Sequence, residues 1–392
     1  MKINIYKTII ISVIVIILGL GIYWFWTFIS KSPETAKGPK PAPTSTVPKQ
    51  KEGGQKKSKK KVEGITVKKV SDNKSKVFDF WTNKAGRIFY IRSDGKIFSA
   101  NKKEEDKKIS NNSLNALNSI EKSPKNKNIL VAHGNPNNPS WMIFDTKDKV
   151  WRPLPEKIEK VTWSEKGDYL IGIIKNGKNL TLGKINLKSL TIKGRDVSYE
   201  KIVSDFRMRD TRIEMVTSTE LIVKERSASF YDSRVWKINM NTKKLELSLK
   251  GVSGLVQKWS EDNNIVFQYS NQEGFQVLNR DFQNIIPVFF NSLPSKCVNS
   301  EKLIFCGAPQ NINPGDKFSL PEDYYKRKFF TNDGIYKINK KTSKIKKVIG
   351  GGNDSRFRKL DIKNPLYRKG NLYFINRYDK GLYKITLPSL NQ

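Results

Sequence analysis

A short apolar run recurs seven times along the chain and has the length of a buried β-strand. Its members are dominated by Ile, Leu, Val, Phe and Tyr, which are enriched in strands. The seven runs lie at 87–91, 128–132, 169–173, 220–224, 264–268, 302–306 and 371–375. No helical period of useful length appears after residue 30, so the pattern predicts an all-β fold.

A small hydroxyl residue stands a few positions before most of these runs, at the end of an expected preceding strand. These residues are Thr82, Ser123, Ser164, Ser218, Ser260 and Ser300, and Arg368 takes the same place in the seventh unit. Most of their spacings match the roughly 40–45-residue period of a four-stranded propeller blade. A third, alternating strand and a more polar fourth strand follow each run, as expected when the outermost strand is exposed. The sequence therefore predicts a seven-bladed β-propeller of four-stranded antiparallel blades over residues 65–392.

The seventh unit ends without a fourth strand, and residues 65–70 (Ile-Thr-Val-Lys-Lys-Val) form a strand without a blade of their own. Pairing this segment with the strand expected at 381–387 would remove an exposed sheet edge. We therefore expect 65–70 to act as the closing strand.

An uncharged stretch from Thr8 to Ile29 predicts one N-terminal transmembrane helix, with residues 1–7 as its cytoplasmic tip. A helix of this length spans about 33 Å, slightly more than the roughly 30 Å hydrocarbon core. Tyr6, Trp24 and Trp26 lie where an aromatic belt is expected. A cleaved signal peptide would have a shorter apolar region and small residues at its cleavage site.

Residues 31–64 are rich in Pro, Gly, Ser, Thr and Lys, which predicts a disordered basic linker. Its lysine cluster at 56–61 suits anionic lipid or wall polymer, or simply a solvated charge run that extends the tether. The lysines near the two helix ends mildly favour a cytoplasmic C-terminal side. The long spacer and a possible disulfide favour an extracytoplasmic propeller, which is the orientation that we expect.

The net charge of +36 is spread over the whole chain. It predicts attraction to anionic polymers but no specific nucleic-acid readout. An abundance of Lys, Asn and Ile, as an AT-rich genome produces, would give the same charge without selection for binding.

The repeat region resembles the bacterial WD-repeat-like or TolB-like propellers, particularly membrane-anchored ones of unassigned role. The resemblance is carried by the segments at 296–309, 320–325, 333–338 and 371–383. The Trp-Asp dipeptide of eukaryotic WD repeats is absent, so their partner repertoire is not carried over. The resemblance implies an envelope-side propeller for protein contacts, without an active site to transfer.

Cys297 and Cys306 are the only cysteines. If Glu301 and Lys302 form a hairpin turn, the two cysteines face each other at a distance that suits a disulfide. Two reduced core cysteines are the alternative. A metal site is disfavoured, because no neighbouring His or Cys completes a coordination shell.

No catalytic constellation is evident. The single histidine, His133, is expected in a Gly/Asn/Pro-rich loop without a nucleophile motif. Acidic residues such as Asp333 are expected to form turns. The arginines at 207, 209 and 212 are expected in an exposed loop rather than in a glycosidase-type site. The sequence indicates no enzyme, no cofactor and no small-molecule substrate.

The segment from Gly307 to Asn332 is a long insertion in the sixth unit. It carries Asp323, Tyr324, Tyr325, Lys326 and Arg327, and Tyr and Arg commonly anchor interfaces. We take these five residues as the candidate partner-binding loop, although packing over its own blade is an alternative.

Three functional hypotheses remain. The leading one is a membrane-anchored extracytoplasmic module that binds an envelope protein or serves as a scaffold. An electrostatic binder of wall polymer or extracellular DNA is the first alternative, and a propeller-face hydrolase is the second.

Overall fold

The computed structural model describes residues 65–387, apart from 84, 102–104, 125–126, 192–196, 209, 311–317 and 351–358. The predicted membrane helix from Thr8 to Ile29 and the predicted linker at 31–64 lie outside the described residues. Within the described ranges, no helix is long and apolar enough to cross a bilayer.

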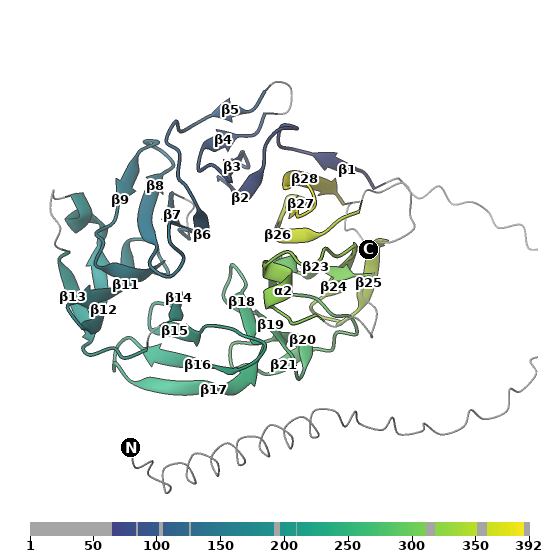
Figure 1. Ribbon diagram of the computed structural model, residues 1–392. Helices are drawn as coiled ribbons and strands as arrows, with labels where there is room; N and C mark the ends of the chain where they lie inside the picture. Colours follow the sequence, from purple (N-terminus) through teal and green to yellow (C-terminus); the bar gives the residue numbers. More distant parts are fainter. Residues whose placement is uncertain are drawn as a thin grey trace, which may run out of the picture. The chain divides into compact units, whose positions relative to one another are not determined.

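The described residues form a ring of seven antiparallel four-stranded sheets, as the repeat predicted (Figure 1). Blade 1 comprises β2 (Val77–Thr82), β3 (Ile88–Arg92), β4 (Ile97–Ser99) and β5 (Lys107–Lys108), and blade 2 comprises β6 (Leu117–Lys122), β7 (Asn128–His133), β8 (Ser140–Asp145) and β9 (Trp151–Pro153). Blade 3 comprises β10 (Ile158–Trp163), β11 (Tyr169–Asn176), β12 (Asn179–Asn186) and β13 (Tyr199–Val203), and blade 4 comprises β14 (Thr211–Thr217), β15 (Glu220–Glu225), β16 (Asp232–Asn239) and β17 (Leu245–Ser253).

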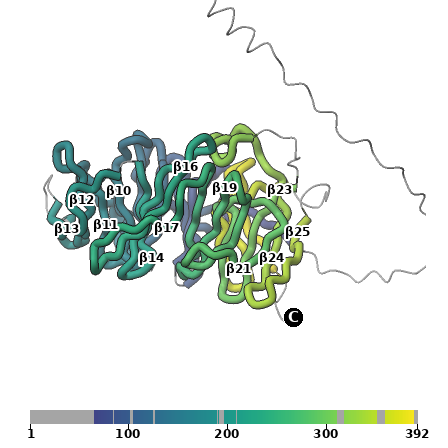
Figure 2. The backbone as a smooth tube through the Cα atoms, turned by 90° about the horizontal axis from the view of Figure 1, so that it is seen from below, coloured from purple at the N-terminus to yellow at the C-terminus, as the bar shows by residue number. Residues whose placement is uncertain are grey.

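Blades 5 to 7 complete the ring. Blade 5 comprises β18 (Val256–Trp259), β19 (Val266–Ser270), β20 (Gly274–Leu278) and β21 (Asn284–Ile286), and blade 6 comprises β22 (Cys297–Asn299), β23 (Leu303–Pro309), β24 (Asp333–Asn339) and β25 (Ile345–Ile349). Blade 7 comprises β26 (Ile362–Arg368), β27 (Asn371–Asn376), β28 (Gly381–Thr386) and β1 (Val67–Lys69). Short 3-10 turns lie at Leu187–Thr191 and Pro294–Lys296. Figure 2, turned by 90°, shows the ring edge-on, with blades 3 to 6 side by side along the near edge.

The core lies in the seams between blades. Each seam holds one cluster of buried apolar side chains from the two blades that flank it. At the seam between blades 7 and 1, for example, Phe80 and Tyr90 pack with Ile375 and Leu382. The recurrent apolar runs form the second strands, whose central residues are buried, whereas outer strands such as β5 are exposed. The predicted fall in hydrophobicity along each blade is confirmed.

Four of the recurrent hydroxyl residues, Ser123, Ser164, Ser260 and Ser300, have a local role in the turn between the first and second strands. Ser123 Oγ accepts hydrogen bonds from the backbone N–H groups of Lys127 and Asn128. Ser260 Oγ accepts one from Ile265, and Ser300 Oγ accepts one from Leu303. A hydroxyl at this position therefore satisfies donors that the turn leaves without a strand partner.

The seventh blade is closed by the N-terminal strand. Val67 of β1 lies opposite Ile385 of β28, in the antiparallel pairing expected for the closing strand. Arg368, which replaces the hydroxyl residue in this blade, donates a 2.7 Å hydrogen bond to Thr82 Oγ1 of blade 1. Strand pairing and this side-chain contact together join the two ends of the ring.

Cys297 and Cys306 form the expected disulfide between β22 and β23. They are directly opposed, with Cα atoms 4.2 Å apart, and both are buried. His133 differs from expectation: it is the last residue of β7, paired with Ser140, rather than a loop residue. The strand extends one residue beyond its apolar run because the hairpin partner continues the ladder.

One face of the ring carries the functional candidates. Each blade is a meander repeated around the ring, so the loops between second and third strands all lie on the same face. Contacts support this arrangement: the backbone N–H of Ser229 in blade 4 donates to Glu322 in blade 6 (2.6 Å), and Asn271 of blade 5 donates to the Ser229 carbonyl (3.2 Å). We call this side the α2 face, after the helix that it carries.

Candidate functional site

The connection between β23 and β24 carries the short helix α2 (Glu322–Tyr325). The five residues of the predicted partner-binding loop, Asp323, Tyr324, Tyr325, Lys326 and Arg327, lie on this helix and in the turn after it. In Figure 1 the helix lies toward the inner part of blade 6.

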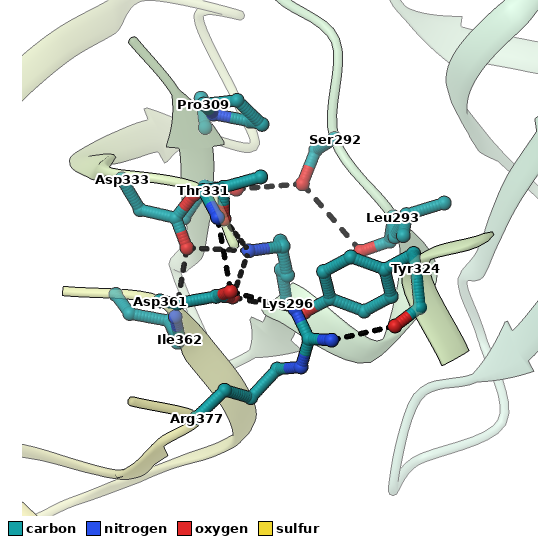
Figure 3. A network of polar contacts seen from close by, with 12 residues as sticks. Ser292, Leu293, Lys296, Pro309, Tyr324, Thr331, Asp333, Asp361, Ile362 and Arg377 are labelled. Carbon is teal, nitrogen blue, oxygen red and sulfur yellow. Dashed lines mark hydrogen bonds and ion pairs between the residues drawn. The ribbon is translucent and has the colours of Figure 1, made fainter. Parts of the chain in front are cut away.

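A buried lysine ties this connection to the blades beneath it (Figure 3). Lys296 Nζ donates hydrogen bonds to Thr331 Oγ1 (2.7 Å), Asp333 Oδ2 (2.6 Å) and Asp361 Oδ1 (2.8 Å). Both carboxylates and the ammonium group are almost completely shielded from solvent. Because Asp361 directly precedes β26, the cluster joins blade 6 to blade 7 as well.

Arg377 extends the network from the β27–β28 turn. Its guanidinium donates to Asp361 Oδ2 (2.6 Å) and to the backbone carbonyl of Tyr324 (2.5 Å). It also lies over the Tyr324 ring, 3.6 Å from the centroid, while the Tyr324 hydroxyl donates to Asp361 Oδ1 (3.1 Å). The helix is therefore held by its backbone and by its aromatic ring.

The network is close to electrically balanced, because two cations face two carboxylates. Burial raises the pKa of Asp333, and the adjacent Lys296 opposes that rise. Burial also raises the pKa of Tyr324 well above its ordinary range, so the hydroxyl remains a donor. Removing one partner of such a buried set costs about 3–5 kcal/mol, because it leaves a charge uncompensated. The network thus fixes α2 in one position.

The predicted loop residues divide into two groups. Tyr324 is 2 % exposed, and the Asp323 carboxylate is turned inward, where it accepts a hydrogen bond from the Ser319 N–H (3.0 Å) and pairs with Lys328 (2.7 Å). Neither offers its side chain to a partner. Tyr325, Lys326 and Arg327 are exposed.

Several residues of the network were not anticipated from the sequence. Asp333 was expected to form a turn, but it begins β24 and binds Lys296. Asp361 and Arg377 belong to no sequence motif that would mark them as members of a buried network. One feature of the sequence could have pointed to the network: a charged residue stands directly next to a buried strand at two places. Lys296 directly precedes β22, and Asp361 directly precedes β26.

Exposed aromatic side chains gather beside α2. Phe230 and Tyr231, in the β15–β16 loop, are 83 % and 39 % exposed, and Tyr325 is 50 % exposed. The hydrogen bond from Ser229 to Glu322 places that loop next to the helix. We define the α2 surface as Phe230, Tyr231, Tyr325, Lys326 and Arg327.

A second set of charges lies on the first strands of the blades. Glu121 accepts hydrogen bonds from Thr162 Oγ1 (2.7 Å) and from the Trp163 N–H (2.9 Å), and burial raises its pKa to about 7. Lys258 Nζ donates to the Cys297 carbonyl (2.9 Å), and burial lowers its pKa to about 8. Both side chains are committed to contacts between neighbouring blades.

The remaining chemical candidates are dispersed. Arg207 is exposed and paired with Asp205, Arg212 lies in β14, and residue 209 is outside the described residues. Within the part of the chain that the structure describes, no three His, Cys, Asp or Glu side chains are grouped so that they could hold a metal ion.

The chain is similar to known proteins in structure but not in sequence. No protein-family model matches the chain, and no curated protein matches it in sequence. An oligogalacturonate lyase from Vibrio parahaemolyticus is similar with a TM-score of 0.57 at 10 % identity, covering 85 % of this chain and 96 % of that one. An uncharacterized protein from Listeria monocytogenes EGD-e reaches a TM-score of 0.50 at 10 % identity, covering 83 % and 99 %.

A TolB from Acinetobacter baumannii is also matched, with a TM-score of 0.33 at 10 % identity over 78 % of this chain and 62 % of that one. That score is too low to carry an argument, so the expected membership of a membrane-anchored TolB-like family stays a prediction. The stronger likenesses agree with the strand pairing on the fold. Over its described residues, the chain is a seven-bladed β-propeller.

Proposed function

We propose that the chain is an interaction module of the cell envelope, which binds a protein partner through the α2 surface. The observation that carries this proposal is the group of exposed aromatic and basic side chains on a rigidly anchored helix and its neighbouring loop. Tyr, Trp and Arg dominate the energetics of protein interfaces. The surface supplies two tyrosines, a phenylalanine and an arginine in one place.

The buried network beneath α2 supports this role. A binding surface that is fixed before the partner arrives loses less conformational entropy on association. Lys296 and Arg377 hold the helix from below, which leaves Tyr325 and Arg327 on the outside. The network therefore holds the α2 surface in its binding conformation and does not itself contact the partner.

The proposed location is outside the cytoplasmic membrane, with the segment from Thr8 to Ile29 as anchor and residues 31–64 as tether. A disulfide between Cys297 and Cys306 favours an oxidising compartment, because cytosolic thiols are kept reduced. The proposal treats the propeller as non-enzymatic. The likeness to an oligogalacturonate lyase, at 10 % identity, transfers no activity.

Site-specific photo-crosslinking in intact cells tests the proposal. A photoreactive phenylalanine analogue is placed in the full-length chain at Tyr325 or Phe230, and as a control at Val150. Val150 is 48 % exposed and lies in the β8–β9 turn, on the face opposite to α2. We expect one discrete protein adduct from both α2-surface positions and none from Val150.

Two outcomes would contradict the proposal. An adduct that forms equally well from Val150 would place the interface elsewhere. Adducts with heterogeneous polymer that disappear in high salt would favour the electrostatic alternative, because binding to anionic polymers falls steeply with salt.

A further inference from the structure

A small basic pocket opens between blades 7 and 1, beside the α2 turn. Its volume is about 160 Å³, and Arg327, Lys363, Arg377 and Lys380 line it together with Phe78 and Ser93. These cations come from three different parts of the chain: the β23–β24 connection, the start of β26, and the β27–β28 turn. The pocket is therefore a product of ring closure.

The lining side chains carry positive charge without a matching negative one. No Asp or Glu belongs to the lining. Among the described residues, Arg327, Lys363 and Lys380 form no ion pair, whereas Arg377 is paired with Asp361. The charged groups of these three side chains therefore line one pocket, and none of them is held in an ion pair with a described residue.

The nearest carboxylates are already engaged. Asp361 binds both Lys296 and Arg377, and Asp333 binds Lys296. Asp79 accepts a hydrogen bond from the Phe80 N–H (2.8 Å) and lies 3.9 Å from the Lys122 ammonium. The buried network balances its own charges, so it supplies no ion pair to Arg327, Lys363 or Lys380. Asp79 and Asp361 offset only part of the charge of Lys363 and Arg327.

The pKa values of two pocket cations, Lys363 and Arg327, are lowered, because burial and the neighbouring positive charges both disfavour the protonated forms. Burial lowers the pKa of Lys363, and the charges of Arg327, Arg377 and Lys380 lower it further, against the opposing influence of Asp79. Burial also lowers the pKa of Arg327, with Arg377 adding to the effect. Cations held close together in a partly desolvated site gain stability from a bound anion.

We propose that this pocket binds a phosphate group. Three cations without an ion-pair partner among the described residues match a doubly charged oxyanion better than a singly charged carboxylate. Arg and Lys are the side chains that recognise phosphate in proteins. A cavity of about 160 Å³ has room for one such group. The inference goes beyond the proposed protein interface, since it assigns a small anion to a cavity. Arg327 is the one residue that the pocket shares with the α2 surface.

The experiment measures thermal unfolding of the full-length chain in detergent, at constant ionic strength and pH 7.5. Inorganic phosphate is titrated against sodium chloride and sodium acetate as reference anions. The pocket variant is Lys363→Gln/Lys380→Gln. The matched control is Lys147→Gln/Lys149→Gln, which removes the same charge from the exposed β8–β9 turn on the other face.

We expect phosphate to raise the melting temperature of the wild-type chain and of the control, with acetate and chloride having little effect. The pocket variant should lose at least tenfold in apparent phosphate affinity. Without phosphate it should be as stable as the wild type or more so, because repulsion among the cations is relieved. An added arm with glycerol phosphate distinguishes an esterified group from the free ion, and stabilisation by either supports the proposal.

Equal responses to phosphate in the pocket and control variants would overturn the proposal, as would an equal response to all three anions. Cross-linking from Tyr325 in the pocket variant separates this proposal from the protein interface. A retained adduct with lost phosphate binding shows that the two sites are independent.

Discussion

The ammonium group of Lys296 lies 2.6 Å from the Asp333 carboxylate, although 37 positions separate the two residues and both are buried. This contact joins the beginning of blade 6 to its third strand, beyond the insertion that carries α2. The same ammonium group reaches Asp361 at the start of blade 7. One side chain thereby fixes the insertion, the blade and the seam beside it.

Replacing Lys296 by Met should lower the free energy of unfolding by about 3–5 kcal/mol, because Asp333 and Asp361 would be left buried with one cation between them. Denaturant unfolding of the full-length chain measures this loss. Lys328→Met is the control: it removes the pair with the Asp323 carboxylate, but the lysine is mostly exposed, so we expect less than about 1 kcal/mol.

A second variant isolates the charge. Lys296→Met combined with Asp333→Asn again leaves one cation facing one carboxylate, so it should recover part of the lost stability. If the double variant is no more stable than Lys296→Met, packing of the lysine stem accounts for the loss and the electrostatic explanation is wrong.

Removing the disulfide should destabilise the chain moderately. Cys297→Ala/Cys306→Ala opens a short loop in the unfolded state, for which chain entropy predicts about 2–3 kcal/mol. Equilibrium unfolding with and without a reducing agent provides the measurement. The wild-type midpoint should fall on reduction, and the double variant should not respond. Thiol labelling of the unreduced, unfolded wild type would contradict the disulfide.

The blade repeat and the disulfide could be predicted because both depend on short-range patterns. The opposition of Cys297 and Cys306 follows from a single hairpin register. The buried network could not be predicted in this way, because Asp333 and Asp361 lie 37 and 65 positions from Lys296 and meet it only after the ring has closed. The sequence does not distinguish the buried Tyr324 from the exposed Tyr325, because aromatic residues on a loop give no local sign of which ring packs inward.

The closing strand should be necessary for a stable ring. A chain that begins at residue 65 retains β1, whereas one that begins at residue 71 loses it and exposes the edge of β28. Val67 also packs against the cluster between blades 6 and 7, so we expect a loss of at least about 2 kcal/mol and a greater tendency to aggregate. Thermal unfolding and light scattering compare the two chains. Equal stability would show that the ring closes without β1.

Stability should also depend on pH through Glu121. Its folded-state pKa of about 7 lies above its ordinary value of 4.5, because burial disfavours the carboxylate. The folded state therefore holds the proton more tightly than the unfolded chain. This contribution is fully present below about pH 4.5 and is lost as the pH rises through about 7.

Glu121→Gln keeps an oxygen acceptor for the Thr162 hydroxyl and the Trp163 N–H but carries no charge. At pH 8 it should exceed the wild type in stability by on the order of 1–3 kcal/mol, and at pH 4.5 the two should be nearly equal. Urea unfolding at both pH values measures the difference. Glu246→Gln, on the exposed outer strand β17, is the control and should show no such change between the two pH values. A Glu121→Gln variant that follows the wild type at both pH values would mean that Glu121 is ionised in the folded ring, with its charge balanced by Lys224.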